Sequence, residues 1–270
     1  MALAPHLTEV VYFLGLGQRL VGRDASSDFP PAATQVAVVG DAFRFDVEAL
    51  LVLKPDLVLA WGSGISAGQL ALLEKADVPV FVSEPGSLAA VHANFQKIAR
   101  LVQADATAFA KIDQWQRSLS DMFKRAHTNT VPAVRVFYQV WDQPLMTLNG
   151  KHVLSELISK CGGINIFANQ PVLAPQVGEE AVLALNPQLL LNSGIYSRAS
   201  NPLQRWQKWP NLEAVQRQQL HTLPPDILVR PGPRLLGAAR LVCGVIQQAR
   251  VSRAIPGGHA EQQPFKGAAQ

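Results

Sequence analysis

Short apolar runs of strand length alternate with helix-period patterns from one end of this 270-residue chain to the other. Such alternation is typical of parallel sheets with helices packed on their faces, so it predicts an α/β fold. The apolar runs predict strands at residues 20–23, 36–39, 56–61, 78–82, 134–140, 188–192 and 219–223. The patterns between them predict helices at residues 6–14, 47–53, 68–76 and 152–159.

One segment interrupts this alternation. Residues 87–127 have no strand signal and carry two successive helical patterns instead. In the second pattern Ile112, Trp115 and Leu119 belong to an apolar stripe along one helix face, and a long helix of this kind is suited to join two lobes rigidly. We therefore predict two Rossmann-like lobes, and the family resemblance given below implies a ligand cleft between them. The predicted parts are an N-terminal lobe at 1–103, a connecting helix at 104–128, a C-terminal lobe at 129–250 and a disordered tail at 251–270.

The two predicted lobes share an internal repeat. Residues 46–61 read DVEALLVLKPDLVLAW and residues 178–193 read GEEAVLALNPQLLLNS, so each copy predicts a short helix, a proline-containing turn and a buried strand. Glu48 coincides with Glu180, although a core does not require a carboxylate at the same place twice. Either each glutamate stabilises the first turn of its helix, where negative charge is favoured, or the two are equivalent surface charges on related lobes.

Several classes of function lack their sequence signals. No apolar stretch approaches the roughly 20 residues of a membrane-spanning helix. The basic residues are scattered despite a net charge of +4, so we expect no nucleic-acid binding. There is no GxSxG motif, phosphate-binding loop or dinucleotide fingerprint, and the six histidines form no metal-binding motif. We expect a binding protein rather than an enzyme, with no catalytic residues and no metal or cofactor of its own.

Two features leave the cellular compartment open. Cys161 and Cys243 lie far apart without a CxxC partner, which argues against a zinc site and allows either two free thiols or one long-range disulfide. Met1 is followed almost at once by Pro5, without the basic segment and apolar run of a leader peptide. The protein is therefore either cytosolic or its leader is absent from this sequence.

Aromatic and polar residues follow the carboxyl ends of several predicted strands, where open α/β sheets bind ligands. Trp61 closes one strand, Trp141 follows another, and Asp226 and Arg230 follow the last. An aromatic platform beside directed hydrogen-bonding groups is the usual composition of a small-molecule site. Arg230 and Arg234 lie near the start of a predicted helix, where positive charge is disfavoured, so we expect one of them to face a ligand or an acidic partner.

With these features the chain resembles the cobalamin-binding members of the substrate-binding proteins of ABC importers, whose two lobes are joined by a rigid helical backbone. The resemblance covers residues 2–248. The segments CGGINIF and PRLLGAARLVC are more specific than KPDLVLAW, which is common among importer proteins. The carrying segments are LAPHLTE (3–9), LVGRDASSDFPP (20–31), the first repeat copy, VRVFYQVWDQPLMTLNGKH (134–152), ELISKCGGINIFA (156–168), LAPQVGEEAVLALNP (173–187) and RPGPRLLGAARLVC (230–243).

This resemblance implies roles for particular residues. Cys161 and Cys243 match a disulfide pair, which implies the oxidising periplasm and favours a truncated leader over a cytosolic protein. Glu48 and Glu180 match lobe-tip glutamates that form salt bridges with arginines of the permease. The residues expected to bind the ligand are Pro5, Ser26, Trp61, Trp141, Asp226, Ile227, Leu228, Val229 and Arg230.

The expected ligand site departs from the family pattern. Five positions where a family member carries aromatic side chains hold Ser26, Ala42, Ala174, Ile227 and Leu228. Each lost stacking contact is worth about 0.5–1.5 kcal/mol. Other aromatic side chains offer compensation, namely Phe43, Tyr138, Trp141 and Tyr196. His6 lies on the segment that approaches the cleft, where its imidazole is either a cobalt ligand or an ordinary polar contact.

The resemblance implies that the protein, as a monomer without membrane insertion, captures cobalamin (vitamin B12) or a related corrinoid and delivers it to an ABC importer permease. One alternative is a ferric siderophore or haem on the same scaffold, with Arg230 and Arg234 facing an anionic siderophore. A second alternative is a metal-binding protein or metal-dependent enzyme, which would need His6, His152 or His221 to converge with a carboxylate.

Overall fold

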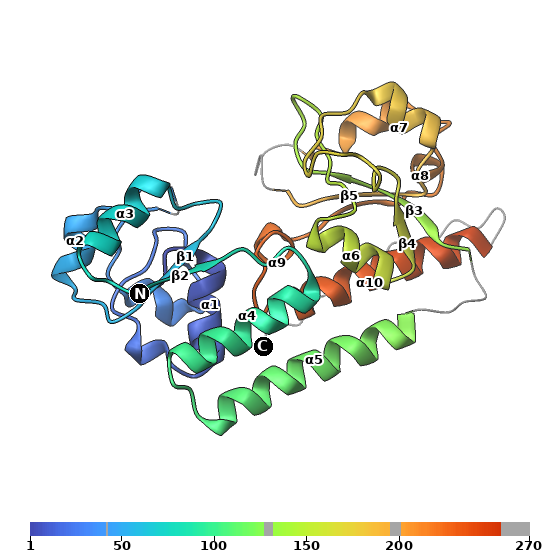
Figure 1. Cartoon of the computed structure of the whole chain (residues 1–270). Helices are drawn as coiled ribbons and strands as arrows, with labels where there is room; N and C mark the ends of the chain where they lie inside the picture. Colours follow the sequence, from blue (N-terminus) through green and yellow to red (C-terminus); the bar gives the residue numbers. More distant parts are fainter. Residues whose placement is uncertain (42, 127–131, 195–200, 255–270) are drawn as a thin grey trace.

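The computed structural model describes residues 1–41, 43–126, 132–194 and 201–254, which fold into two α/β lobes (Figure 1). Each lobe has a parallel sheet with helices around it, so the predicted α/β class is confirmed. Among the described helices none is both long and apolar enough to span a membrane.

The N-terminal lobe is built on a small parallel sheet. Strands β1 (Val58–Trp61) and β2 (Val80–Ser83) pair in parallel, with Leu59 beside Phe81. The predicted helices at 6–14, 47–53 and 68–76 are found to within one residue at each end. The helices of this lobe are α1 (Pro5–Phe13), α2 (Val47–Val52) and α3 (Ala67–Lys75), with 3-10 turns η1 (Gly17–Arg19) and η2 (Pro31–Gln35).

Two strands predicted for this lobe are wrong as strands. Residues 20–23 and 36–39 reach the sheet only through single bridges, which pair Ala2 with both Arg23 and Leu59, and Arg23 with Val38. The buried guanidinium of Arg23 donates hydrogen bonds to the carbonyl oxygens of residues 24, 25 and 34. These bonds hold the chain in a compact loop directly after Arg23, and the two runs on either side of this loop pair with the sheet through single bridges alone.

The C-terminal lobe has a four-stranded parallel sheet in the order β4-β3-β5-β6. Its strands are β3 (Val134–Gln139), β4 (Gly163–Asn165), β5 (Leu189–Asn192) and β6 (Leu220–Thr222). The strands predicted in this region are confirmed, but β4 was not predicted because three residues that include glycine and asparagine form no apolar run. The helices around the sheet are α6 (Val153–Lys160), α7 (Glu179–Leu185) and α8 (Glu213–Gln216), with the 3-10 turn η3 (Gln204–Lys208).

Four further helices lie between and beneath the lobes. They are α4 (Leu88–Leu101), α5 (Ala106–Ala126), α9 (Pro225–Leu228) and α10 (Leu235–Ala254). Figure 1 shows α5 running beneath both lobes, and α5 packs against α4 and α10. At 1.5 Å per residue, a 21-residue helix is about 30 Å long, which is enough to reach from one lobe to the other.

The largest hydrophobic core cluster joins the two lobes. It contains the predicted stripe of α5 (Ile112, Trp115 and Leu119) together with residues of α1 on one side and of β3, β5 and α6 on the other. Two smaller clusters fill the interior of the C-terminal and N-terminal lobes separately. Because the shared core passes through α4, α5 and α10, these helices form a common base for both lobes.

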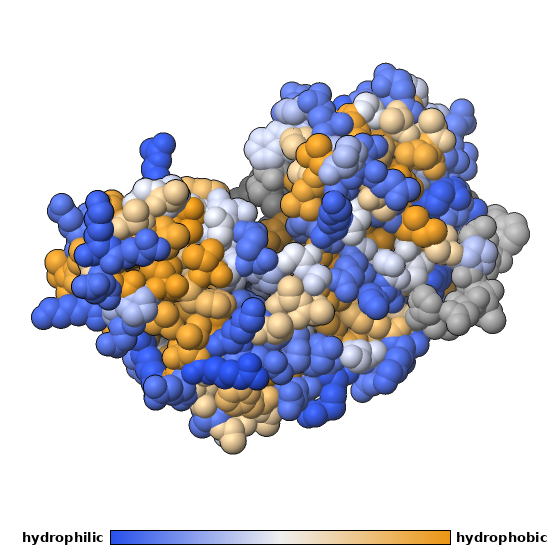
Figure 2. All heavy atoms as spheres, viewed as in Figure 1, coloured by the Kyte–Doolittle hydropathy of each residue, from blue (hydrophilic) through white to orange (hydrophobic). Residues whose placement is uncertain are grey.

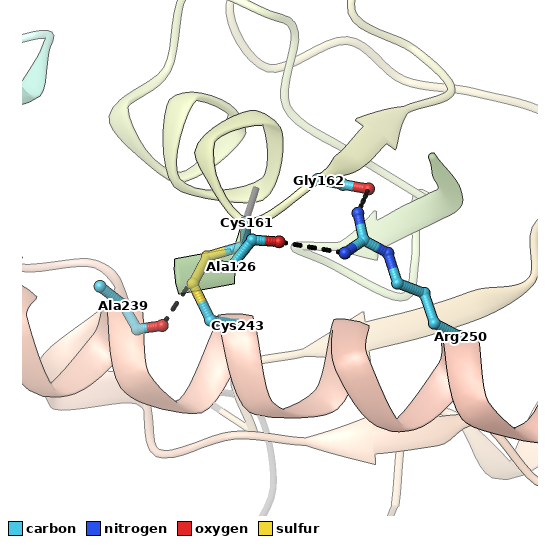
Figure 3. The surroundings of a disulfide bond; sticks show 6 residues. All are labelled: Ala126, Cys161, Gly162, Ala239, Cys243 and Arg250. Carbon is cyan, nitrogen blue, oxygen red and sulfur yellow. Dashed lines mark hydrogen bonds between the residues drawn. A yellow bond between two sulfur atoms is a disulfide. The ribbon is translucent and has the colours of Figure 1, made fainter. Parts of the chain in front are cut away.

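A disulfide ties α10 to the C-terminal lobe (Figure 3). It joins Cys161, at the end of α6, to Cys243 on α10, with their Cα atoms 4.7 Å apart. Nearby, Arg250 donates hydrogen bonds to the carbonyl oxygens of Ala126 (3.1 Å) and Gly162 (2.8 Å), so the end of α5 is held at the same place. Of the predicted tail at 251–270, residues 251–254 belong to α10 and the rest lies outside the described residues.

Candidate functional site

The internal repeat folds into equivalent units in the two lobes. One unit is α2 followed by β1, and the other is α7 followed by β5. Each helix is followed by a residue in the left-handed region directly before the proline, Lys54 with φ 45° and Asn186 with φ 41°. This shared turn confirms that the repeat describes a structural unit rather than chance leucine spacing.

Glu48 and Glu180 lie in the first turns of these helices with exposed side chains. In α2 the capping acceptor is Asp46, whose carboxylate accepts hydrogen bonds from the backbone of residues 48 and 49. In α7 the neighbouring Glu179 is paired with Arg205 and Lys208. Among the described residues neither Glu48 nor Glu180 has an ion-pair partner, so both carboxylates are available to another protein.

The molecular surface is hollowed between the lobes (Figure 2). Trp61, at the carboxyl end of β1 in the N-terminal lobe, is half-buried. Its indole Nε1 donates to Glu84 Oε1 at 3.2 Å, and its ring meets Phe43 edge-on with the ring centroids 5.7 Å apart. Phe43 is 61% exposed. The two rings form an aromatic surface that a flat ligand can contact.

From the C-terminal lobe, Trp141 follows the last strand residue of β3 by two positions. Its side chain is 41% exposed, and Nε1 donates to the carbonyl oxygen of Gln143 at 2.8 Å. Two other aromatic side chains were proposed as compensation. Tyr138 is buried in the core, and Tyr196 lies outside the described residues. Ala42, one of the positions without an aromatic side chain, also lies outside the described residues.

The remaining predicted ligand residues differ in exposure. Ser26 and Val229 are exposed, whereas Pro5, Asp226 and Ile227 are half-buried. Leu228 is fully buried in the large core cluster, so the structure does not bring its side chain to the surface of the cleft.

Arg230 lies in an ion cluster at the junction of the lobes. Its guanidinium is 2.7 Å from Asp28 Oδ1, 3.3 Å from Asp226 Oδ1 and 3.4 Å from Glu9 Oε1. Arg234 lies 2.5 Å from the same oxygen of Glu9. Burial opposes ionisation of Asp28, but the hydrogen bond and charge of Arg230 outweigh it and lower the pKa of Asp28. Both arginines are therefore neutralised by carboxylates of the chain itself.

Sequence reasoning singled out Asp226 but missed the other two carboxylates of this cluster, Glu9 and Asp28. Glu9 is a buried charge on α1 among the buried apolar residues Leu7, Val10 and Val11. A carboxylate on the apolar face of a helix is almost never buried without a partner, and this signal was present in the sequence. The sequence did not reveal which residue is the partner, because Arg234 lies 225 residues from Glu9 along the chain.

The three histidines considered for a metal site lie on different elements. His6 is buried in α1, His152 is the N-cap of α6 and His221 lies in β6, beside Gln219. The described residues contain no group of three or more His, Cys, Asp or Glu side chains that could hold a metal ion.

We expect the free energy of unfolding to fall in mild acid because of two histidines, of which His6 is buried and His152 is half-buried. Burial lowers the pKa of His152 to about 4, and burial with the charge of Arg230 lowers that of His6 to about 4. In the unfolded chain both imidazoles bind a proton near pH 6.5, whereas in the folded protein they do so only near pH 4. Their contribution to the free energy of unfolding is therefore complete above pH 6.5 and is lost as the pH falls towards 4. Each histidine accounts for about 1.4 kcal/mol per pH unit in this range.

The substitution His152→Asn tests this expectation. His152 Nδ1 accepts a hydrogen bond from the backbone N–H of Leu154 at 3.1 Å, and an asparagine oxygen can accept it without titrating. In urea unfolding between pH 7.5 and 4.5, the variant should lose about 2–3 kcal/mol less than the parent protein. Identical pH profiles for the two proteins would contradict the assignment.

Comparison with known proteins gives the family. Residues 1–227 match the family model described as periplasmic binding protein. The chain is 34% identical over 251 residues to the vitamin B12-binding protein of Vibrio cholerae serotype O1, and the match covers 93% of this chain and 89% of that protein.

Solved structures agree with this result. The crystal structure of the periplasmic vitamin B12-binding protein of Vibrio cholerae matches with a TM-score of 0.79 at 34% identity, over 92% of this chain and 96% of that one. The periplasmic haem-binding protein RhuT from Roseiflexus matches with a TM-score of 0.81 at 22% identity, over 92% and 97% of the two chains, which shows a common fold alone. The chain therefore belongs to the periplasmic binding protein family.

Proposed function

We propose that this protein captures cobalamin or a related corrinoid between its lobes and delivers it to the permease of an ABC importer. The observation that carries this proposal is the 34% identity to a vitamin B12-binding protein over 93% of the chain. In this role the protein breaks no bond, and the corrinoid is its cargo rather than a cofactor. The proposed location is the periplasm, because that compartment is oxidising and the chain contains a disulfide.

The charges at the lobe junction support a corrinoid over an anionic ligand. The corrin ring carries neutral amide side chains, whereas haem carries propionate carboxylates and catecholate or carboxylate siderophores form anionic ferric complexes. Arg230 and Arg234 are already paired with Glu9, Asp28 and Asp226. An anionic ligand that recruited these arginines would leave the buried carboxylate of Glu9 without its partners, which is strongly unfavourable.

The aromatic side chains support contact with a flat ring system. Phe43 and Trp61 would contact the ligand from the N-terminal lobe, and Trp141 from the C-terminal lobe. Ile227 and Val229 add apolar surface at the junction. In this proposal Phe43 and Trp141 replace part of the stacking surface that the family carries at other positions.

The exposed carboxylates of Glu48 and Glu180 are the proposed contacts with the permease. They lie on equivalent elements of the two lobes, so they would engage two equivalent sites on a symmetric pair of permease subunits. Asp46 caps α2, and Glu179 forms the ion pairs with Arg205 and Lys208 beside α7. Neither of these tasks falls to Glu48 or Glu180.

Calorimetric titration with cyanocobalamin tests the proposed ligand. We expect one-to-one binding at micromolar or tighter affinity, and a loss of about tenfold for Trp61→Ala, since a stacked aromatic contact and its buried area are removed. Dicyanocobinamide shows whether the nucleotide loop of cobalamin is needed, and haemin serves as the anionic comparison. Absence of corrinoid binding by the folded protein, or preference for haemin, would overturn the proposal.

A further inference from the structure

The ion cluster at the lobe junction connects parts of the chain that belong to different lobes. Glu9 lies on α1 and Asp28 on a loop of the N-terminal lobe, whereas Arg230 and Arg234 lie between α9 and α10. In Figure 1 α9 occupies the space between the lobes, close to α1. Glu9 is the central member, because its side chain is only 2% exposed and it is within salt-bridge distance of both arginines.

The segment that carries the arginines is held on other sides as well. The guanidinium of Arg234 stacks on the ring of Phe29, 4.3 Å from its centroid. The carbonyl oxygen of Pro233 accepts a hydrogen bond from Trp115 Nε1 on α5 at 2.8 Å. A side chain at Gly232 would come within 3.2 Å of Glu9 Oε2, so this segment packs directly on α1. The arginines are therefore fixed relative to both α1 and α5.

A continuous set of strong contacts then runs from one lobe to the other. Glu9 joins α1 to Arg234, which directly precedes α10. Further along α10, Cys243 is bonded to Cys161 of the C-terminal lobe. Helix α10 is thus attached at its start to the N-terminal lobe by charge and in its middle to the C-terminal lobe by a covalent bond.

We propose that Glu9 is a positioning residue, which holds the two lobes at a fixed separation through Arg230 and Arg234. The connecting helix α5 is one link between the lobes, and the ion cluster is a second link, between α1 and the start of α10. Because the cluster is made of the chain's own side chains, the separation is set before any ligand enters. The effect on ligand affinity rests on the proposed function, whereas the effect on lobe separation does not.

Distance measurement between spin labels tests this assignment. Nitroxides are attached at Lys75→Cys on α3 and Gln216→Cys on α8, two exposed positions in different lobes, with the native disulfide kept oxidised. Without ligand, the parent protein should give one narrow distance distribution, and Glu9→Gln should widen it at least twofold. The matched control is Asp226→Asn, which removes a half-exposed partner of Arg230 on the same side of the junction and should leave the width unchanged.

A second variant keeps the test decisive if Glu9→Gln does not fold. Asp28→Asn removes the exposed contact across the junction and should widen the distribution to a smaller extent. A parental distribution in folded Glu9→Gln, or in Asp28→Asn when Glu9→Gln does not fold, would overturn the proposal. Cyanocobalamin affinity, measured separately, should fall about tenfold in Glu9→Gln because fewer molecules hold the binding-competent arrangement. If the parent protein binds no corrinoid, the proposed function fails while the distance result stands.

Discussion

Replacing Glu48 and Glu180 together by lysine should abolish uptake while leaving the ligand affinity of the purified protein unchanged. In the proposed complex with the permease, each substitution turns an attraction between carboxylate and arginine, about 4 kcal/mol for a close pair at an effective dielectric constant near 20, into a repulsion of similar size. Because both lobes are affected, we expect uptake to fall by about a hundredfold or more. The measurement pairs an uptake assay in cells that carry the importer with calorimetry on the isolated variant.

The chain offers a control with the same change in net charge. Glu74 on α3 and Asp113 on α5 are exposed acidic residues outside the repeat units. Their double replacement by lysine should leave uptake close to that of the parent protein. If reversal of Glu48 and Glu180 lowers ligand affinity instead, the two residues belong to the cleft or to the fold. Normal uptake by that variant would exclude them from docking.

Local patterns in the sequence were sufficient for most of the fold. The repeat unit, the helices of the N-terminal lobe and the strands of the C-terminal lobe depend on apolar periodicity and on proline at a turn, which are properties of neighbouring residues. The three errors in strands have other origins. β4 is too short to show a period. Residues 20–23 and 36–39 lie on either side of a loop that is held by hydrogen bonds from the buried guanidinium of Arg23, and no local pattern reveals these bonds.

The candidate site was predicted less completely because its charges meet only in the folded chain. Arg230 and Arg234 lie near a helix start, where a cation is unfavourable, and this local rule predicted that one of them faces a ligand or an acidic partner. The acidic partners lie within the chain, with Glu9 221 residues from Arg230. Leu228 was included among the ligand residues because the family resemblance matches it to an aromatic position of the ligand site, whereas the structure buries its side chain in the core. The ion pairs that Arg230 and Arg234 form with Glu9 and Asp28 therefore decide whether these arginines remain available to a ligand.

Loss of the disulfide between Cys161 and Cys243 should be the largest change in stability among single-site perturbations of this chain. The bond spans a sequence separation of 82 residues, and in the chain-entropy model a loop of this size stabilises the native state by about 4.5 kcal/mol. The double substitution to alanine should therefore lower the urea midpoint by more than about 1 M. The parent protein, denatured without reductant, should show no titratable thiol. Two titratable thiols, or equal unfolding free energies with and without the cysteines, would contradict the bond and remove its support for a periplasmic location.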